Sequence, residues 1–182
     1  MTTKTVIALL AAAALVTACQ TTPEEPLRAT AQLKPTKGSK VFGEVSFEQV
    51  GDKVRMQVVV QGLKPGGEYG FHIHEVGDCS AHDATSTKGH FNPFSKPHGY
   101  WGDAERHAGD LPSIVVPKGE KKRPNKAGRA KLDVTLEQIT LMPGPGNIIG
   151  RGIIVHAQPD DYTTQPTGNA GARIACGVIQ AQ

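Results

Sequence analysis

The sequence predicts an all-β domain in which short antiparallel strands form a sandwich or a barrel. Runs of alternating or β-branched residues recur along the chain, and 21 glycines and 13 prolines supply turns between them. No segment of the domain shows the periodicity of an amphipathic helix. The expected strands are residues 41–47, 54–60, 69–74, 114–116, 130–136, 148–155 and 173–179.

Each expected strand carries its own signal. Residues 41–47 alternate in side-chain size and polarity, whereas 54–60 is rich in valine and is followed by a Gly-Pro turn. In residues 69–74, His72 and His74 lie two apart and therefore share one strand face, while apolar side chains share the other. The later segments are short apolar runs bounded by glycine or proline, as expected of buried strands.

Residues 76–111 interrupt this pattern because they contain no strand-like run. This stretch holds four histidines, one cysteine and one tryptophan. Loops of this length in a compact domain are usually functional or disordered. The composition therefore predicts a loop that is ordered by ligands rather than by an apolar core.

Residues 1–18 are interpreted as a lipoprotein signal peptide outside the fold. Lys4 gives a short positive region, and the apolar run 6–18 is too short to span a bilayer as a mature helix. The run ends in Val-Thr-Ala before Cys19, which resembles a bacterial lipobox with Cys19 as the lipidated residue. An ordinary secretory signal with an incidental cysteine is the alternative.

Residues 19–28 are expected to form a lipidated N-terminal tether ahead of a folded domain at 29–182. The segment after Cys19 is polar and contains proline, as in a linker. Several acyl chains would anchor the protein stably to a membrane, because a single chain binds only marginally. We expect attachment on the periplasmic side of a bacterial cell envelope. Gln20 rather than aspartate follows Cys19, which favours the outer membrane.

Cys79 and Cys176 remain once Cys19 is assigned to the lipid. An even pair in an exported chain predicts one disulfide. It would close a loop of about 97 residues, and the entropic model gives such a bond about 4–5 kcal/mol at most.

The net charge argues against a nucleic-acid-binding protein. The formal charge is +3 at pH 7, which is too small and too scattered for binding to a polyanion. The one basic cluster, residues 118–126, lies among proline and glycine and is interpreted as a solvated loop.

The histidines indicate a metal centre, because all seven lie between residues 72 and 156. Imidazole suits copper and zinc, and a single carboxylate among histidines suits a tetrahedral zinc site. A His-x-His pair alone is weak evidence, but six histidines and an aspartate around a disulfide are much stronger. The candidate ligands are His72, His74, His90, His98, His107, Asp110 and His156.

Several motifs in this order resemble the copper/zinc superoxide dismutases, in particular a bacterial lipoprotein form. The resemblance extends over about residues 30–182 and implies a Greek-key antiparallel β-barrel or sandwich of about eight strands with long metal-binding loops. Residues 29–182 would then be the superoxide dismutase domain. The motifs are GFHIHE at 70–75, GDC at 77–79, GHFNP at 89–93, HAGDLP at 107–112, VH at 155–156 and GNAGARIACGVI at 168–179.

The resemblance implies copper and zinc as cofactors. His90 would bridge the two ions as an imidazolate, and zinc would supply charge without redox chemistry because its d shell is full. Copper would be held by His72, His74, His90 and His156, and zinc by His90, His98, His107 and Asp110.

The resemblance also implies the reaction and its further residues. Superoxide would be converted to oxygen and hydrogen peroxide, which protects the cell envelope. Arg173 and His90 would be catalytic, since Arg173 attracts and orients the superoxide anion and His90 carries a proton. Asp160 would accept hydrogen bonds from one copper histidine and one zinc histidine, which fixes both rings.

Some residues have no assigned role in this interpretation. His82 matches no ligand position and is interpreted as a solvated loop residue, with an accessory or adventitious metal contact as the alternative. The final loop lacks the acidic and lysine cluster of eukaryotic relatives, so Lys88 and Lys96 are weak candidates for steering the substrate. Trp101 fits either a homodimer contact or packing within the loop.

Three other functions remain to be compared. A copper-delivery module on the same fold would lack some ligands or the arginine, and a copper-only dismutase would lack the zinc ligands. An adhesin on this scaffold has no support beyond the fold. Metal analysis together with an assay of superoxide loss separates all three from the main interpretation.

Overall fold

The computed structural model describes residues 25–118 and 127–182, which form a curled antiparallel sheet and a small second sheet. The predicted signal peptide at 1–18 and Cys19 lie outside the described residues, as do most of the predicted tether and most of the basic cluster. The described residues contain no α-helix, only the 3₁₀ turn η1 (Thr85–Thr87). Across these two described ranges, no helix has the length and apolarity needed to cross a membrane.

The main sheet has eight strands in the order β5-β8-β9-β1-β2-β3-β7, with β10 added beside β1, and β4 pairs with β6. The neighbours β5–β8 and β3–β7 are separated by crossover connections, as in a Greek key. The strands are β1 (Arg28–Pro35), β2 (Phe42–Val50), β3 (Lys53–Leu63), β4 (Glu68–Tyr69), β5 (Phe71–His74), β6 (Ile114–Val115), β7 (Gly128–Leu136), β8 (Gly152–His156), β9 (Arg173–Val178) and β10 (Gln180–Ala181).

The core lies inside the curl of this sheet. In β3, Val54, Met56, Val58 and Val60 are buried and alternate with more exposed residues, as the period of a strand requires. Met56 pairs across strands with Phe47 of β2, and both side chains are buried. Full burial of one such side chain stabilises the fold by about 1.5–3 kcal/mol.

The predicted fold class is confirmed, but four strand predictions need correction. β1 was not expected, although Ala29, Ala31 and Leu33 alternate on its buried face. The expected strand 148–155 begins only at Gly152, because Gly150 adopts a turn conformation with φ +80°. The expected strand 69–74 divides into β4 and β5, which belong to different sheets, and the short β10 was also missed.

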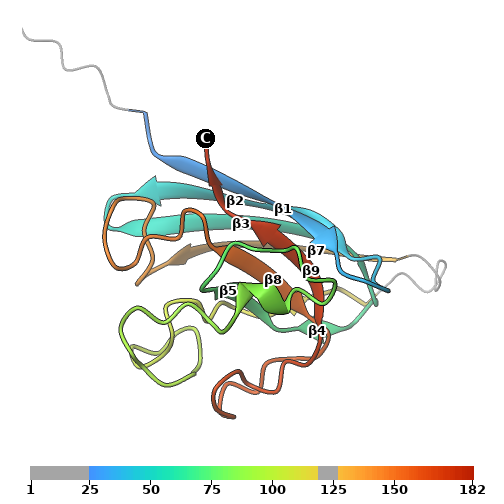
Figure 1. The fold of residues 1–182 in the computed structure, drawn as a ribbon. Helices are drawn as coiled ribbons and strands as arrows, with labels where there is room; N and C mark the ends of the chain where they lie inside the picture. Colours follow the sequence, from blue (N-terminus) through green and yellow to red (C-terminus); the bar gives the residue numbers. More distant parts are fainter. Residues whose placement is uncertain (1–24, 119–126) are drawn as a thin grey trace, which may run out of the picture.

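Two long connections follow β5 and β8, and they position the site. Figure 1 shows most of both connections on the side of β5 and β8 that faces away from β2 and β3, while the start of the first runs back beside β9. The first, residues 75–113, contains only η1, which agrees with the expected absence of strands in 76–111. The second, residues 157–172, runs between β8 and β9.

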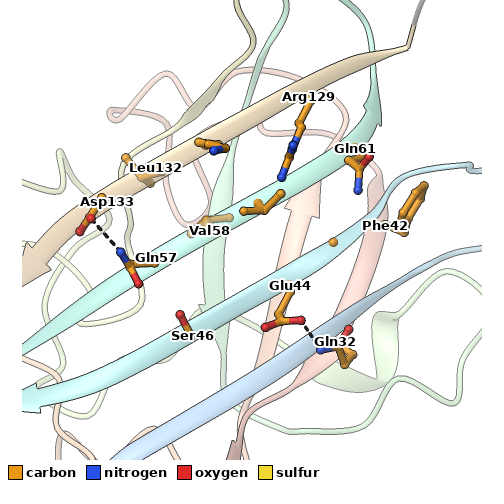
Figure 2. Close-up of a pocket in the computed structure, with 13 residues that line it drawn as sticks. Gln32, Phe42, Glu44, Ser46, Gln57, Val58, Gln61, Arg129, Leu132 and Asp133 are labelled. Carbon is orange, nitrogen blue, oxygen red and sulfur yellow. Dashed lines mark hydrogen bonds between the residues drawn. The ribbon is translucent and has the colours of Figure 1, made fainter.

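A polar groove of about 830 Å³ lies on the outer face of β1, β2, β3 and β7. In it Gln32 donates a hydrogen bond to Glu44, and Gln57 donates one to Asp133 (Figure 2). None of the residues that line this groove is a histidine predicted to bind metal.

Candidate metal centre

The free edge of β5 brings residues of the first long connection beside His72 and His74. The backbone N–H of Ile73 donates to the carbonyl of Gly109 at 2.9 Å, and the N–H of Phe91 donates to the carbonyl of Ile73 at 2.8 Å. Gly109 is required at this point, because a Cβ there would collide with the Ile73 carbonyl oxygen. These bonds place His90 opposite His74 and Asp110 opposite His72.

A first cluster consists of four buried histidines whose potential ligand nitrogens all lie within 4.8 Å of one another. His72 and His74 come from β5, and His156 ends β8, so three of the four rings are mounted on paired strands. The fourth ring, that of His90, comes from the first long connection. The cluster is His72, His74, His90 and His156.

The orientation of two of these rings is fixed by backbone carbonyls. His74 Nδ1 lies 2.9 Å from the Lys88 carbonyl oxygen, and His156 Nδ1 lies 3.1 Å from that of Gly171. Because a carbonyl only accepts, each Nδ1 carries the proton and each Nε2 presents a lone pair. The two Nε2 atoms lie 3.4 Å apart, and a cation between them removes the repulsion of their lone pairs.

Asp160 links this cluster to a second one. Its Oδ2 accepts a hydrogen bond from His72 Nε2 at 2.7 Å, and its Oδ1 accepts one from His98 Nε2 at 2.9 Å. In both rings Nε2 therefore faces Asp160 and Nδ1 points away from it. The structure thus brings Asp160 to the two rings that the sequence predicted, one from each cluster.

The second cluster surrounds the Asp110 carboxylate. Its Oδ1 lies 2.9 Å from His90 Nδ1, 3.0 Å from His98 Nδ1 and 3.3 Å from His107 Nδ1. Ligands at about 2.0–2.1 Å in a tetrahedral zinc site lie about 3.3 Å from each other, so these spacings suit zinc. The other oxygen, Oδ2, accepts hydrogen bonds from the backbone N–H groups of Gly99 and His107 and is thereby held in place.

Burial and the two carboxylates set the charge of this region. Burial, reinforced by neighbouring histidines, lowers the pKa of both His90 and His156 to about 3, so these rings are neutral lone-pair donors at neutral pH. Burial also opposes a charge on His98, but the nearby carboxylates of Asp110 and Asp160 outweigh it and raise its pKa to about 9. Burial acts against the charges of Asp110 and Asp160 as well, yet their histidine partners hold the pKa of both carboxyls well below the usual range.

The donor atoms of both clusters fit metal ions. Buried polar atoms almost always have a hydrogen-bond partner, so those without one need an explanation. Both clusters together supply four such nitrogens, each facing a cluster of the composition that copper and zinc prefer. They are His72 Nδ1, His90 Nε2, His98 Nδ1 and His107 Nδ1.

Arg173 begins β9, paired with His156 at the end of β8. Its guanidinium donates hydrogen bonds to the Ala84 carbonyl at 2.6 Å, the Thr87 hydroxyl at 2.8 Å and the Lys88 carbonyl at 2.6 Å. The Lys88 carbonyl is also the acceptor for His74, so one oxygen joins the arginine to the first cluster. Arg173 therefore lies beside the four-histidine cluster, where the sequence predicted it.

The predicted disulfide between Cys79 and Cys176 is confirmed, with Cα atoms 5.9 Å apart. It ties the first long connection to β9. Beneath it lies a small apolar cluster of Ala84 and Ile154 packed with the two cysteines. This cluster is separate from the main core, so the bridge supports a region with little apolar packing of its own.

The structure also places the residues that had no assigned role. His82 is exposed and joins neither cluster, in agreement with the sequence interpretation. Trp101 packs against the main core, which supports packing within the loop. Lys96 is paired with Glu105 at 2.8 Å, whereas Lys88 is exposed and has no ion pair within the described residues.

Sequence reasoning missed the groups that orient the ligands. The carbonyls of Lys88 and Gly171 fix two ring tautomers, but a backbone carbonyl is present at every residue and leaves no signal in a sequence. Gln165, which contacts the backbone of His98, was also missed because an exposed glutamine in a polar loop has no pattern of its own.

Comparison with known proteins agrees with this geometry. The family model described as copper/zinc superoxide dismutase (SODC) matches residues 41–179. Superoxide dismutase [Cu-Zn] 2 of Aquifex aeolicus is 38% identical over 160 residues, which is 86% of this chain and 88% of the relative. Superoxide dismutase [Cu-Zn] 2 of Brassica juncea is 41% identical over 162 residues, which is 85% of this chain and 98% of the relative.

Two solved structures are similar as well. The crystal structure of the clock protein EA4 has a TM-score of 0.73 and 42% identity, and the match covers 86% of this chain and 96% of that one. A SOD-like protein from Bacillus subtilis has a TM-score of 0.71 and 34% identity, and the match covers 82% of this chain and 96% of that one. Both matches extend over nearly the whole of the described fold.

Proposed function

The chain belongs to the copper/zinc superoxide dismutase family, and from this premise we propose that it converts superoxide to oxygen and hydrogen peroxide at a copper joined to zinc through His90. It is an oxidoreductase with copper and zinc as cofactors. In this proposal His72, His74, His90 and His156 hold copper, and His90, His98, His107 and Asp110 hold zinc.

The observation that carries this proposal is the pair of facing nitrogens in the first cluster. His74 and His156 each donate a hydrogen bond from Nδ1 to a backbone carbonyl. Their Nε2 atoms, each with a lone pair, lie 3.4 Å apart. Two neutral acceptors at this distance repel each other unless a cation lies between them. The arrangement supports a metal at this point.

The two ions have different tasks. When bound, copper supplies the change of oxidation state that electron transfer needs, whereas zinc supplies positive charge without redox chemistry. His90 is the residue common to both clusters, with Nδ1 beside Asp110 and a buried Nε2 that has no protein partner. His90 is therefore placed to link the ions and to hold a proton at Nε2 whenever that atom is not a ligand.

Arg173 is the proposed substrate-guiding residue. Its guanidinium is partly exposed and is held by three acceptors, one of which is the carbonyl that also accepts from His74, so its charge has a fixed position beside the histidine cluster. A guanidinium stays charged at every working pH and offers donors in a planar fork. These properties suit the attraction and orientation of a small anion.

We further propose that the protein protects a bacterial cell envelope from superoxide, anchored on the periplasmic side through a lipid on Cys19. The support is the lipobox-like sequence before Cys19 and the polar tether after it. The absence of aspartate after Cys19 favours the outer membrane as the site of attachment.

Elemental analysis of the purified protein, run together with an assay of superoxide loss, tests the proposed metal centre. His156→Ala should lose copper and activity but keep zinc, because His156 belongs only to the first cluster. His82→Ala is the matched control, since this exposed histidine belongs to neither cluster. Near-normal activity in His156→Ala, or a copper loss equal to that of the control, would refute the copper assignment.

A further inference from the structure

Gln165 makes a two-point contact with the backbone of His98. Its side-chain oxygen accepts a hydrogen bond from the His98 N–H at 2.8 Å, and its side-chain nitrogen donates one to the His98 carbonyl at 2.8 Å. The two residues are 67 positions apart and lie on the two different long connections. The contact therefore joins the loop 157–172 to the loop that carries the zinc cluster.

Only one orientation of the Gln165 side-chain amide satisfies both hydrogen bonds. The backbone N–H only donates and the carbonyl only accepts, so the amide oxygen must face the first and the amide nitrogen the second. The side chain acts like one residue of a neighbouring β-strand, which exchanges both hydrogen bonds with its partner. No other side chain of similar length can do this, because glutamate has no donor when ionised.

The same loop also holds the His98 side chain. Asp160 accepts the Nε2 proton of His98 at 2.9 Å. Gly168, with φ +63°, approaches so closely that a Cβ there would lie 2.5 Å from His98 Nε2. The loop 157–172 therefore contacts both the backbone and the ring of His98.

Within its own loop Gln165 makes one long hydrogen bond, from its side-chain nitrogen to the Thr163 carbonyl at 3.4 Å, and other groups hold that loop. Asp161 accepts hydrogen bonds from the backbone N–H groups of Thr163 and Thr164, and from the Asn169 side chain. The edge-on contact of Tyr162 with Tyr100, at 5.2 Å between ring centroids, also keeps the two loops in contact. The Gln165 amide is thus available for His98, and its removal leaves the other loop contacts in place.

We propose that Gln165 is a positioning residue for the zinc ligand His98, and that it couples zinc binding to the order of the loop 157–172. This inference rests on the proposed zinc role of His98. The loop begins directly after His156 and ends directly before Arg173, and these two residues are held by the pairing of β8 with β9. Partners that orient a metal ligand commonly contribute about 10–100-fold to metal affinity.

The test measures zinc affinity by competition with a chelator in the full-length chain loaded with copper. Gln165→Ala should bind zinc about tenfold more weakly than the wild type, at the lower end of that range. Gln165→Glu should weaken it at least as much, because its carboxylate faces the His98 carbonyl oxygen. Gln57→Ala, which removes an exposed glutamine whose amide bonds Asp133 far from the metals, should bind zinc like the wild type.

A second measurement separates positioning from a general loss of stability. Cobalt(II) bound in place of zinc should show an altered visible absorption spectrum in Gln165→Ala but not in Gln57→Ala, while copper affinity stays unchanged. Zinc affinity within twofold of the wild type in both Gln165 variants would overturn the inference. His98→Ala tests the underlying assignment separately, because retention of zinc there would refute the zinc role of His98 whatever the Gln165 variants show.

Discussion

Reversal of the charge at Arg173 should lower the rate of superoxide loss without loss of metal. Arg173 donates to the Lys88 carbonyl at 2.6 Å, and His74 donates to the same oxygen at 2.9 Å. The guanidinium and the His74 ring therefore lie within about 6 Å of each other, a distance at which a unit charge interacts with an anion by about 0.7 kcal/mol in a water-like dielectric. Arg173→Glu changes the charge at this position by two units, so the interaction energy with superoxide changes by about 1.4 kcal/mol. This corresponds to about a tenfold change in the local concentration of superoxide.

Arg173→Lys should lose less than Arg173→Glu. The lysine keeps the positive charge but cannot donate to Ala84, Thr87 and Lys88 from one planar fork. We expect a several-fold decrease in the second-order rate constant, caused by poorer orientation rather than by weaker attraction. Copper and zinc contents should match the wild type in both variants, because neither cluster includes Arg173.

The assay is the decay of pulse-generated superoxide at low and at physiological ionic strength. The Debye length falls from about 30 Å at 0.01 M to about 8 Å at 0.15 M, so the difference between wild type and Arg173→Glu should shrink as salt is added. Lys96→Glu serves as a control with the same charge change, since Glu105 already neutralises Lys96 in the wild type. Equal decay of wild type and Arg173→Glu at low salt, with both metals loaded, would show that Arg173 does not guide the substrate.

Three further predictions follow from the same structure. Asp110→Ala should lose zinc before copper and loosen the first long connection, which zinc analysis and hydrogen exchange will measure; unchanged zinc stoichiometry would contradict it. Reduction should convert Cys79 and Cys176 to thiols and destabilise the region around His90, and mass spectrometry that finds both thiols free in the natively exported protein would refute the role of the bridge. Cys19→Ser should move the protein from membranes to the soluble envelope fraction with its activity retained, whereas a wild-type chain that is soluble and unacylated would exclude the lipid anchor.

The strands that could be predicted are those in which burial imposes a visible pattern. β3 and β7 alternate between core and solvent, so their periodicity follows directly from the sheet. β1 was missed because its buried face uses two alanines, which have little strand propensity and give a weak apolar signal. Ile148 and Ile149 were assigned to a strand in error, because their apolar character reflects core packing of a turn.

The candidate site was predictable where a side chain itself carries the chemistry. The six clustered histidines and Asp110 are chemically unusual in one chain. Arg173 lies within the motif at 168–179, and Asp160 follows the VH motif by four residues. The groups that orient these ligands could not be predicted in the same way. Gln165 and the carbonyls of Lys88 and Gly171 act through backbone geometry that exists only once distant segments meet.

The distribution of ligands along the chain indicates which ion orders the first long connection. Three of the four copper candidates, His72, His74 and His156, sit on β5 and β8, where strand pairing already holds the backbone. All four zinc candidates belong to the connection itself, from which Phe91, Ala108 and Leu111 enter the main core and Ala84 packs beside the disulfide. Ordering the backbone of each residue costs about 1–2 kcal/mol, so a long segment with little core needs strong local contacts. Structural zinc binding is of the magnitude required, at about 10–16 kcal/mol in small domains. We therefore propose that zinc organises the loop that would present His90 to copper, in addition to supplying positive charge.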